Sequence, residues 1–147
     1  MVLDTNATLD WLVFGNAAMD ALGKTIEAGL VCWLACPRMR EELSRTLAYP
    51  ALAKWNPQCE RTLSHFDRWV LLTPNPPVSV AQALLCSDRD DQVFIDLAVA
   101  GRARWLVTQD RALLKLRRRA ALSGVAIVRP AQWLFDAQDA ATADSKR

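Results

Sequence analysis

The sequence predicts an α/β fold in which helices cover both faces of a central parallel sheet of about four to five strands, a three-layer α/β/α arrangement. Short apolar runs alternate with longer segments of helix-like apolar spacing along the whole chain. The apolar runs are continuous, which is typical of strands buried on both faces. With 147 residues, 52% of them hydrophobic and 23% charged, the chain is expected to form one domain with one core.

The N-terminal half is predicted to hold three strands and three helical segments. Residues 1–3 are an apolar run, and residues 7–29 repeat apolar residues at helical spacing, with a break at Gly15-Asn16 and an end at Gly29. The other elements follow from apolar runs or amphipathic spacing: a strand at 30–35, a helix at 37–49 that starts at a proline and stops before another, a helix at 57–69 and a strand at 70–73.

The C-terminal half continues the alternation. An acidic start, an apolar face and a glycine stop predict a helix over 87–101. A closing helix is expected over 130–138, the domain is expected to span 1–137, and the tail 138–147 is expected to be loose. The remaining expected elements are a short helix at 79–85, a strand at 104–108, a helix at 110–124 and a strand at 125–128.

Acidic residues fall where the predicted strands end. One follows the first strand, another follows the strand at 104–108, and two more open the helix before that strand. A further pair lies in the helix after the second strand. Because the carboxyl ends of parallel strands share one edge of a sheet, where binding sites form, we expect these acids to meet there: Asp4, Glu41 or Glu42, Asp88, Asp91 and Asp110.

Carboxylates gathered in one place repel one another unless a positive charge lies among them. A hard divalent cation with oxygen ligands, Mg²⁺ or Mn²⁺, removes that repulsion. The sequence therefore predicts a site for one or two such ions. Ordinary structural roles also remain open: caps for Asp4 and Asp110, helix-start acids for Asp88 and Asp91, and a solvated charge for Glu42.

Four short motifs follow one another along the chain: VLDTN, EEL, DRDDQVF and VTQD. Together they resemble the motifs of the PIN domain, a family of metal-dependent ribonucleases, and especially its VapC-like branch, the toxins of toxin–antitoxin pairs. The resemblance covers the chain from Met1 to about Trp133. It implies a PIN-like form of the three-layer fold.

The resemblance also implies roles for single residues. Glu42 matches the second acid of the family because it directly precedes Leu43, and Asp91 matches the third because it lies three residues before Phe94. The implied catalytic residues and metal ligands are Asp4, Glu42, Asp91 and Asp110, with Asp88 as a further candidate ligand and with Asn6 and Thr108 as neighbours that support the ligands.

Two positions depart from the pattern of this branch. Arg89 stands where Pro is usual, and Gln109 stands where Gly is frequent. Since Gln109 lies beside the site, its bulk is expected to affect access of the substrate. Neither departure removes an acid.

The implied activity is hydrolysis of phosphodiester bonds in single-stranded RNA by an endoribonuclease that uses Mg²⁺ or Mn²⁺ and acts as the toxin of a type II pair. The implied partners are RNA, a small antitoxin protein encoded separately, and a second copy of the chain in a homodimer. Two other classes remain open: a non-catalytic PIN-like module that binds RNA or protein, and a phosphatase of the haloacid dehalogenase type. That phosphatase needs an aspartate two residues after the first, where this chain has Asn6.

A basic cluster begins directly after the last of these acids. It is either a patch that binds RNA phosphates or a solvated helix face. Its members are Arg111, Lys115, Arg117, Arg118 and Arg119. Trp55, beside Lys54 in a polar turn, is a candidate for stacking on a base, with burial in the core as the alternative.

Composition also bears on the location of the protein and on the state of its cysteines. No stretch approaches the roughly 20 apolar residues of a membrane helix, and no signal peptide is readable, so we expect a cytoplasmic protein without membrane contact. The four cysteines and the single histidine, His65, lack zinc-site spacing, and the cysteines are expected to be reduced thiols packed in the interior.

Overall fold

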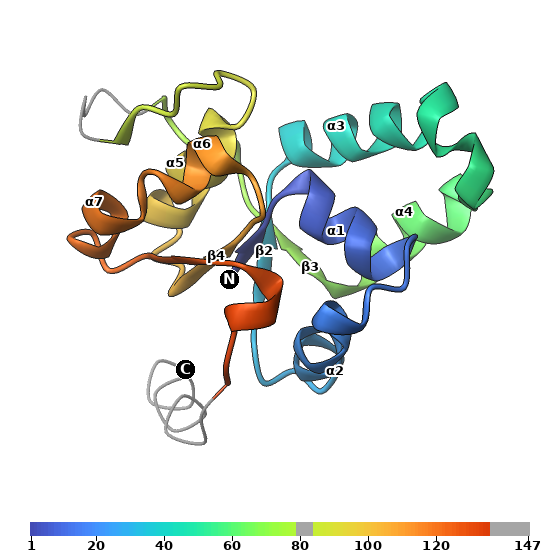
Figure 1. Ribbon diagram of the computed structural model, residues 1–147, viewed down its shortest axis with the longest axis horizontal. Coiled ribbons are helices and arrows are strands. Elements are labelled where there is room, and N and C mark those ends of the chain that lie inside the picture. The colour runs from blue at the N-terminus through green and yellow to red at the C-terminus, as the bar shows by residue number, and fades with distance from the viewer. Residues whose placement is uncertain (79–83, 136–147) are drawn as a thin grey trace.

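The computed structural model describes residues 1–78 and 84–135 (Figure 1). The short helix expected over 79–85 falls mostly outside these residues, and the expected tail at 138–147 lies wholly outside them. Within the described ranges, no helix is long and apolar enough to cross a membrane.

Five short parallel strands form the centre of the described molecule. They are β1 (Val2–Leu3), β2 (Trp33–Ala35), β3 (Val70–Leu72), β4 (Trp105–Val107) and β5 (Ala126–Val128). β4 lies between β1 and β5, with Leu3 opposite Val107, and β2 pairs with β3. The Leu34 N–H donates to the Met1 carbonyl oxygen (2.8 Å), which places β2 beside β1. The strands therefore follow the order β3-β2-β1-β4-β5.

Helices lie on both sides of these strands. They are α1 (Thr5–Leu12), α2 (Asp20–Glu27), α3 (Pro37–Leu47), α4 (Cys59–Trp69), α5 (Gln92–Ala100), α6 (Arg111–Leu114) and α7 (Arg117–Ala121), with 3₁₀ turns η1 (Ala17–Met19), η2 (Pro50–Trp55) and η4 (Pro130–Gln132). In Figure 1, α5, α6 and α7 lie to the left of β2, and α1 to α4 lie to its right. The predicted three-layer α/β/α fold is confirmed.

Two helix ends form as predicted. Gly29 follows α2 with a φ of +71°, a conformation that glycine adopts without steric cost. The N–H groups of Gly29 and Leu30 donate to the carbonyl oxygens of Ile26 and Thr25 (2.9 and 3.1 Å), so the last turn of α2 is closed by a Schellman-type cap. At the start of α3, Pro37 occupies the first turn, where no partner for a backbone N–H is needed.

The helix expected over 87–101 starts later, at Gln92. The Asp90 N–H donates to Asp88 Oδ1 (3.0 Å), and this local hydrogen bond holds a turn in place of a helical start. The acids that were expected to open the helix therefore lie in a loop before it.

Two further predictions of helix were only partly right. The helix expected over 110–124 is divided into α6 and α7, because the Leu116 N–H donates to the Leu113 carbonyl oxygen (2.9 Å), three residues back, where the chain changes direction. The helix expected over 130–138 is a single 3₁₀ turn in its described part. Trp133 leaves the helical conformation and packs edge-on against Trp105, with ring centroids 5.8 Å apart.

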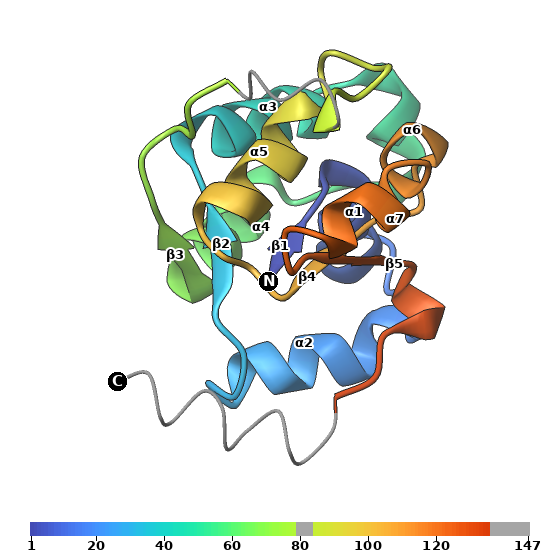
Figure 2. The same ribbon diagram turned by 90° about the vertical axis from the view of Figure 1, so that its left-hand side faces the viewer.

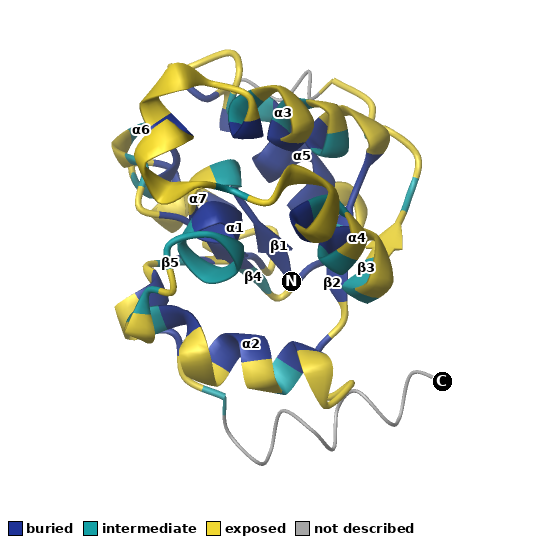
Figure 3. Cartoon of the chain, turned by 90° about the vertical axis from the view of Figure 1, so that its right-hand side faces the viewer, coloured by how far each residue is buried: buried dark blue, intermediate teal, exposed yellow. Residues whose placement is uncertain are grey.

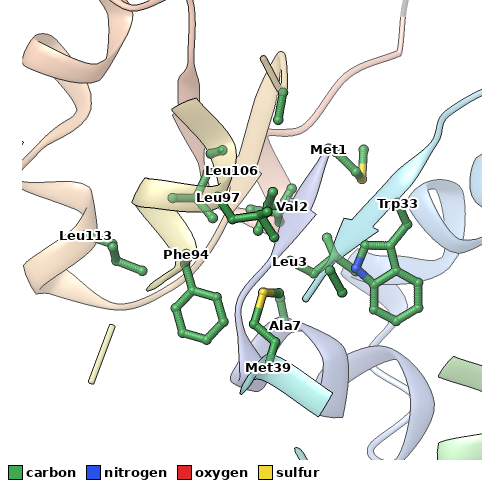
Figure 4. Close-up of a cluster of buried hydrophobic side chains, with 14 of the residues drawn as sticks. Met1, Val2, Leu3, Ala7, Trp33, Met39, Phe94, Leu97, Leu106 and Leu113 are labelled. Atoms are coloured by element: carbon green, nitrogen blue, oxygen red, sulfur yellow. The ribbon is translucent and has the colours of Figure 1, made fainter. Parts of the chain in front are cut away.

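The core lies between the layers, and Figure 3 shows it as the buried parts of the central strands and of α1 and α5. Figure 4 shows Phe94 and Leu97 of α5 in the same apolar cluster as Val2 of β1, Trp33 of β2 and Met39 of α3. This packing fixes β1, α3 and α5 relative to one another. The acids carried at the ends of these elements are therefore held by the core.

All four cysteines are free thiols, as predicted, although two of them are exposed.

Candidate active site

Asp4 lies at the carboxyl end of β1. Its N–H donates to the Val107 carbonyl oxygen (3.2 Å), and its side chain is almost completely buried. Oδ1 accepts a hydrogen bond from the Ala7 N–H (2.7 Å), so Asp4 caps α1. Oδ2 accepts a hydrogen bond from the Thr108 hydroxyl. Asp4 thus caps α1 with one carboxylate oxygen, and its second oxygen contacts Thr108 at the end of the neighbouring strand β4.

Thr108 connects the two acids that follow these neighbouring strands. It is fully buried, and its Oγ1 accepts from the Asp110 N–H (2.9 Å) while its own proton is donated to Asp4. Asp110 Oδ1 accepts from the N–H groups of Ala112 and Leu113 (2.6 and 3.3 Å) and caps α6. Within the described residues Asp110 Oδ2 accepts no hydrogen bond, which leaves this oxygen available to a ligand.

Glu42 is brought to the same edge by α3. The Thr5 hydroxyl donates to Glu42 Oε1 (2.7 Å) and so joins the first turn of α1 to α3. Glu42 is half-buried, whereas the adjacent Glu41 is exposed. Sequence analysis did not predict this role for Thr5, because nothing in the spacing identifies a partner 37 residues away.

Asp91 is the acid on which the others act most strongly. Burial, followed by repulsion from the carboxylates of Asp110, Asp88, Asp4 and Glu42 in decreasing order, raises the pKa of Asp91 to about 7. No described residue donates a hydrogen bond to its side chain, and it does not cap α5. Its carboxylate therefore has no structural task that would explain its position among other acids.

The pKa of Asp4 is also raised, to about 6. Burial is the main cause, and repulsion from Asp110 and Asp10 adds to it. The hydrogen bonds from Thr108 and Ala7 act in the opposite direction, because they stabilise the charged form. Burial and mutual repulsion thus disfavour the charged forms of both carboxylates, and a positively charged ligand would stabilise these forms.

The donor set fits a hard divalent cation. It consists of carboxylate oxygens, and it includes an Asp91 side chain without a hydrogen-bond donor and a free oxygen on Asp110. In the described part of the chain, no three His, Cys, Asp or Glu side chains form a ready-made cage for a metal. A cation bound among these acids would have to draw their side chains closer together, and it would lower the pKa values of Asp4 and Asp91.

Three other residues from the sequence motifs lie at or near this edge in different ways. Asp88 is exposed in the loop before α5 and acts on the site by its charge. Asn6 is exposed, and its side chain makes no hydrogen bond with a described residue. Gln109 Nε2 donates to Asp10 Oδ2 (2.8 Å), so this side chain is turned toward α1.

The five basic residues predicted to bind RNA are all exposed: Arg111 opens α6 directly after Asp110, Lys115 lies in the turn between α6 and α7, and the other three lie on α7. Among the described residues none of the five forms an ion pair. Trp55 is 48% exposed and contacts the ring of Phe14 (centroids 4.8 Å apart). It lines a hollow of about 310 Å³ between α1, η2 and α4, together with Trp11 and His65, so it is not part of the core.

Comparison with known proteins identifies the family. The family model of the PIN domain matches residues 1–112, which contain the four acids that the sequence motifs singled out. No curated protein matches the chain. PIN domains are typically nucleases and generally use divalent metal ions, which agrees with the gathered carboxylates. The chain therefore belongs to the PIN domain family.

Proposed function

We propose that this protein is a metal-dependent endoribonuclease that cuts single-stranded RNA. The observation that carries the proposal is the position of Asp91, which lies without a hydrogen-bond donor among four other carboxylates that raise its pKa. Such an arrangement is unfavourable for stability alone and is typical of sites that bind a ligand. A divalent cation together with a phosphodiester is the ligand that this chemistry fits best.

Asp4, Glu42, Asp91 and Asp110 would hold one or two Mg²⁺ or Mn²⁺ ions, with Asp88 as an additional ligand. Such an ion, when bound, lowers the pKa of a water molecule and neutralises charge on the phosphate. Thr108 orients this set, since its donated and accepted hydrogen bonds fix Asp4 relative to Asp110. The Thr5 hydroxyl positions Glu42 in the same way.

The purified protein is expected to cut single-stranded RNA in Mg²⁺ or Mn²⁺ and to stop in EDTA. The physical reason is that the acids repel a phosphodiester unless a cation lies between them. Product lengths on gels, with labelled single-stranded and double-stranded RNA of the same sequence, provide the measurement. Cleavage that persists in excess EDTA, or no cleavage of varied RNAs with either ion, argues for a PIN-like binding module without catalysis.

The exposed basic residues of α6 and α7 are proposed to contact RNA phosphates. Replacing Arg117, Arg118 and Arg119 by glutamine is expected to weaken RNA binding and to reduce the slope of log K against log salt concentration by about 2, because three fewer counterions are released. Fluorescence anisotropy at several salt concentrations measures this slope. An unchanged slope would assign these arginines to a solvated helix face.

We further propose that the protein acts as a toxin that is inhibited by a separate small antitoxin protein, and that it works as a homodimer. The motifs shared with the VapC-like branch support this proposal. Induced expression of the folded protein is expected to arrest growth, and co-expression of the neighbouring small reading frame is expected to restore it. Normal growth during strong expression would contradict the proposed toxin role but would not contradict the proposed nuclease activity.

A further inference from the structure

One face of α3 presents basic and aromatic side chains next to the acidic site. Arg38, Glu42, Arg45 and Tyr49 follow one another at spacings of three or four residues and so lie on one side of the helix and its end. We call these four residues the α3 face. Together with Thr46 and Asp90 they line a hollow of about 380 Å³. By helical geometry the α3 face spans about 16 Å.

The arginines of this face are not used for folding. Arg40, on another side of α3, forms a bidentate ion pair with Asp67 of α4, with both N–O distances 2.7 Å. In contrast, Arg38 and Arg45 are exposed, and neither forms an ion pair with a described residue. Two free guanidinium groups beside Glu42 leave positive charge next to the acids. This charge is available to an anion that reaches the acidic site.

The residues that line the hollow include one of the acids of the site and the neighbour of another. Glu42 belongs both to the α3 face and to the acids that raise the pKa of Asp91. Asp90, which also lines the hollow, directly precedes Asp91 in the chain. Arg38 also lines a second hollow of about 460 Å³, together with Arg89, so the positive charge extends past the start of α3. Figures 1 and 2 show that α3 and α5, which carry residues lining these hollows, both lie in the upper part of the molecule.

Tyr49 gives the face a surface for a nucleobase. Its side chain is 56% exposed at the end of α3, although large aromatic side chains are usually buried. An exposed ring that follows two exposed arginines has the composition of surfaces that bind single strands without sequence preference. Trp55, the other strongly exposed aromatic residue described above, lies in a different hollow.

We infer that the α3 face is a binding subsite for a single-stranded RNA, in which Arg38 and Arg45 contact successive phosphates and Tyr49 stacks on a base. This inference rests on the proposed function, because it assumes that RNA is the substrate of the acidic site. The strand then leaves the acids along α3. This direction differs from that of α6 and α7, which lie on the other side of β2 from α3 in Figure 1.

The test measures binding of a labelled single-stranded oligouridylate in EDTA, so that no cutting interferes. The double variant Arg38→Gln/Arg45→Gln is expected to bind about 20-fold more weakly at 0.1 M salt, with a salt slope smaller by about 1.4. The matched control is Arg61→Gln/Arg68→Gln, which removes two exposed arginines at the same spacing from α4. An unchanged slope in the α3 variant, or an equal loss in the α4 control, overturns the subsite.

Tyr49 is tested by two substitutions in the same assay. Tyr49→Ala is expected to weaken binding about tenfold, whereas Tyr49→Phe keeps the ring and is expected to bind like the wild type. Trp55→Ala serves as the control for loss of an exposed aromatic ring. If Trp55→Ala weakens binding and Tyr49→Ala does not, the stacking role belongs to the other hollow and the assignment of Tyr49 is wrong.

Failure of this inference can be told apart from failure of the proposed function. If the wild-type protein cuts RNA and the α3 double variant binds RNA as tightly as the wild type, only the proposed subsite is refuted. If the wild-type protein binds RNA through the α3 face but cuts no RNA with either metal, only the proposed nuclease activity is refuted. In an active enzyme, the α3 double variant is expected to raise KM while kcat changes little, since the contacts lie outside the reacting bond. An unchanged KM contradicts the subsite.

Discussion

Replacing Asp91 by asparagine is expected to abolish RNA cleavage and, at the same time, to make the metal-free protein more stable at pH 8. Under the proposed function, cleavage should fall by at least about 100-fold, because Asp91 would be a charged ligand of the metal ion. Stabilisation by added metal, about 2.7 kcal/mol for the wild type at 100 times its dissociation constant, should shrink in the variant. Melting curves with and without Mn²⁺ and RNA cleavage assays measure both effects.

The gain in stability follows from the raised pKa of Asp91, about 7 in the folded protein against 3.8 for the free side chain. A raised pKa means that the folded state binds the proton more tightly than the unfolded state does. The contribution of Asp91 to the free energy of unfolding therefore falls as the pH rises from about 4 to about 7. The full shift would correspond to about 4 kcal/mol, but because Asp91 is only half-buried we expect a gain of about 1–2 kcal/mol in Asp91→Asn.

The difference between wild type and Asp91→Asn should be largest above pH 7 and should vanish below pH 4. Urea unfolding of the metal-free proteins across this range measures it. Asp20→Asn, at an exposed position in the first turn of α2, is the control for loss of a carboxylate elsewhere. Parallel pH profiles for wild type and Asp91→Asn, together with retained cleavage, would return Asp91 to the status of a surface charge.

Replacing Thr108 by valine is expected to cost about 2–4 kcal/mol of stability, although the two side chains have nearly the same shape. Thr108 is fully buried, and valine can neither donate to Asp4 nor accept from the Asp110 N–H. Each buried group left without a partner costs about 1–3 kcal/mol. Cleavage should also fall, because Asp4 loses the contact that orients it.

The effect of Thr108→Val should depend on pH in a defined direction. The lost hydrogen bond lowers the pKa of Asp4, so its removal should raise that pKa above about 6 and should destabilise the protein more at pH 8 than at pH 5. Thr108→Ser keeps the hydroxyl and should lose only about 1 kcal/mol for the missing methyl group. Equal losses in the valine and serine variants would show that the hydroxyl is not what matters.

The sequence was sufficient for the parts of the site that follow from strand order. Asp4 and Asp110 each come directly after a short apolar run, and adjacent parallel strands bring such positions to one edge regardless of side-chain detail. The same reasoning predicted the sheet and the alternation of layers. These features depend on periodicity, which a sequence displays directly.

Other features depend on contacts between distant segments, and these could not be predicted. The choice between Glu41 and Glu42 followed from the resemblance, and the structure adds the hydrogen bond from Thr5, which only tertiary packing supplies. The late start of α5 results from a local hydrogen bond between Asp90 and Asp88, two residues that equally suit a helix start. The sequence shows that the residues of the α3 face share one side of a helix, but only the structure places this face near Asp91.

The pairing of β1 with β4 has a consequence for the order of events during translation. Thr108, which together with Asp110 completes the surroundings of Asp4, follows Asp4 by 104 residues, so it leaves the ribosome much later than Asp4 does. Until then, the nascent chain exposes a lone aspartate at the end of an unpaired strand. A site built across such a distant pairing therefore stays unassembled in the nascent chain until the later strand has been made and the domain closes.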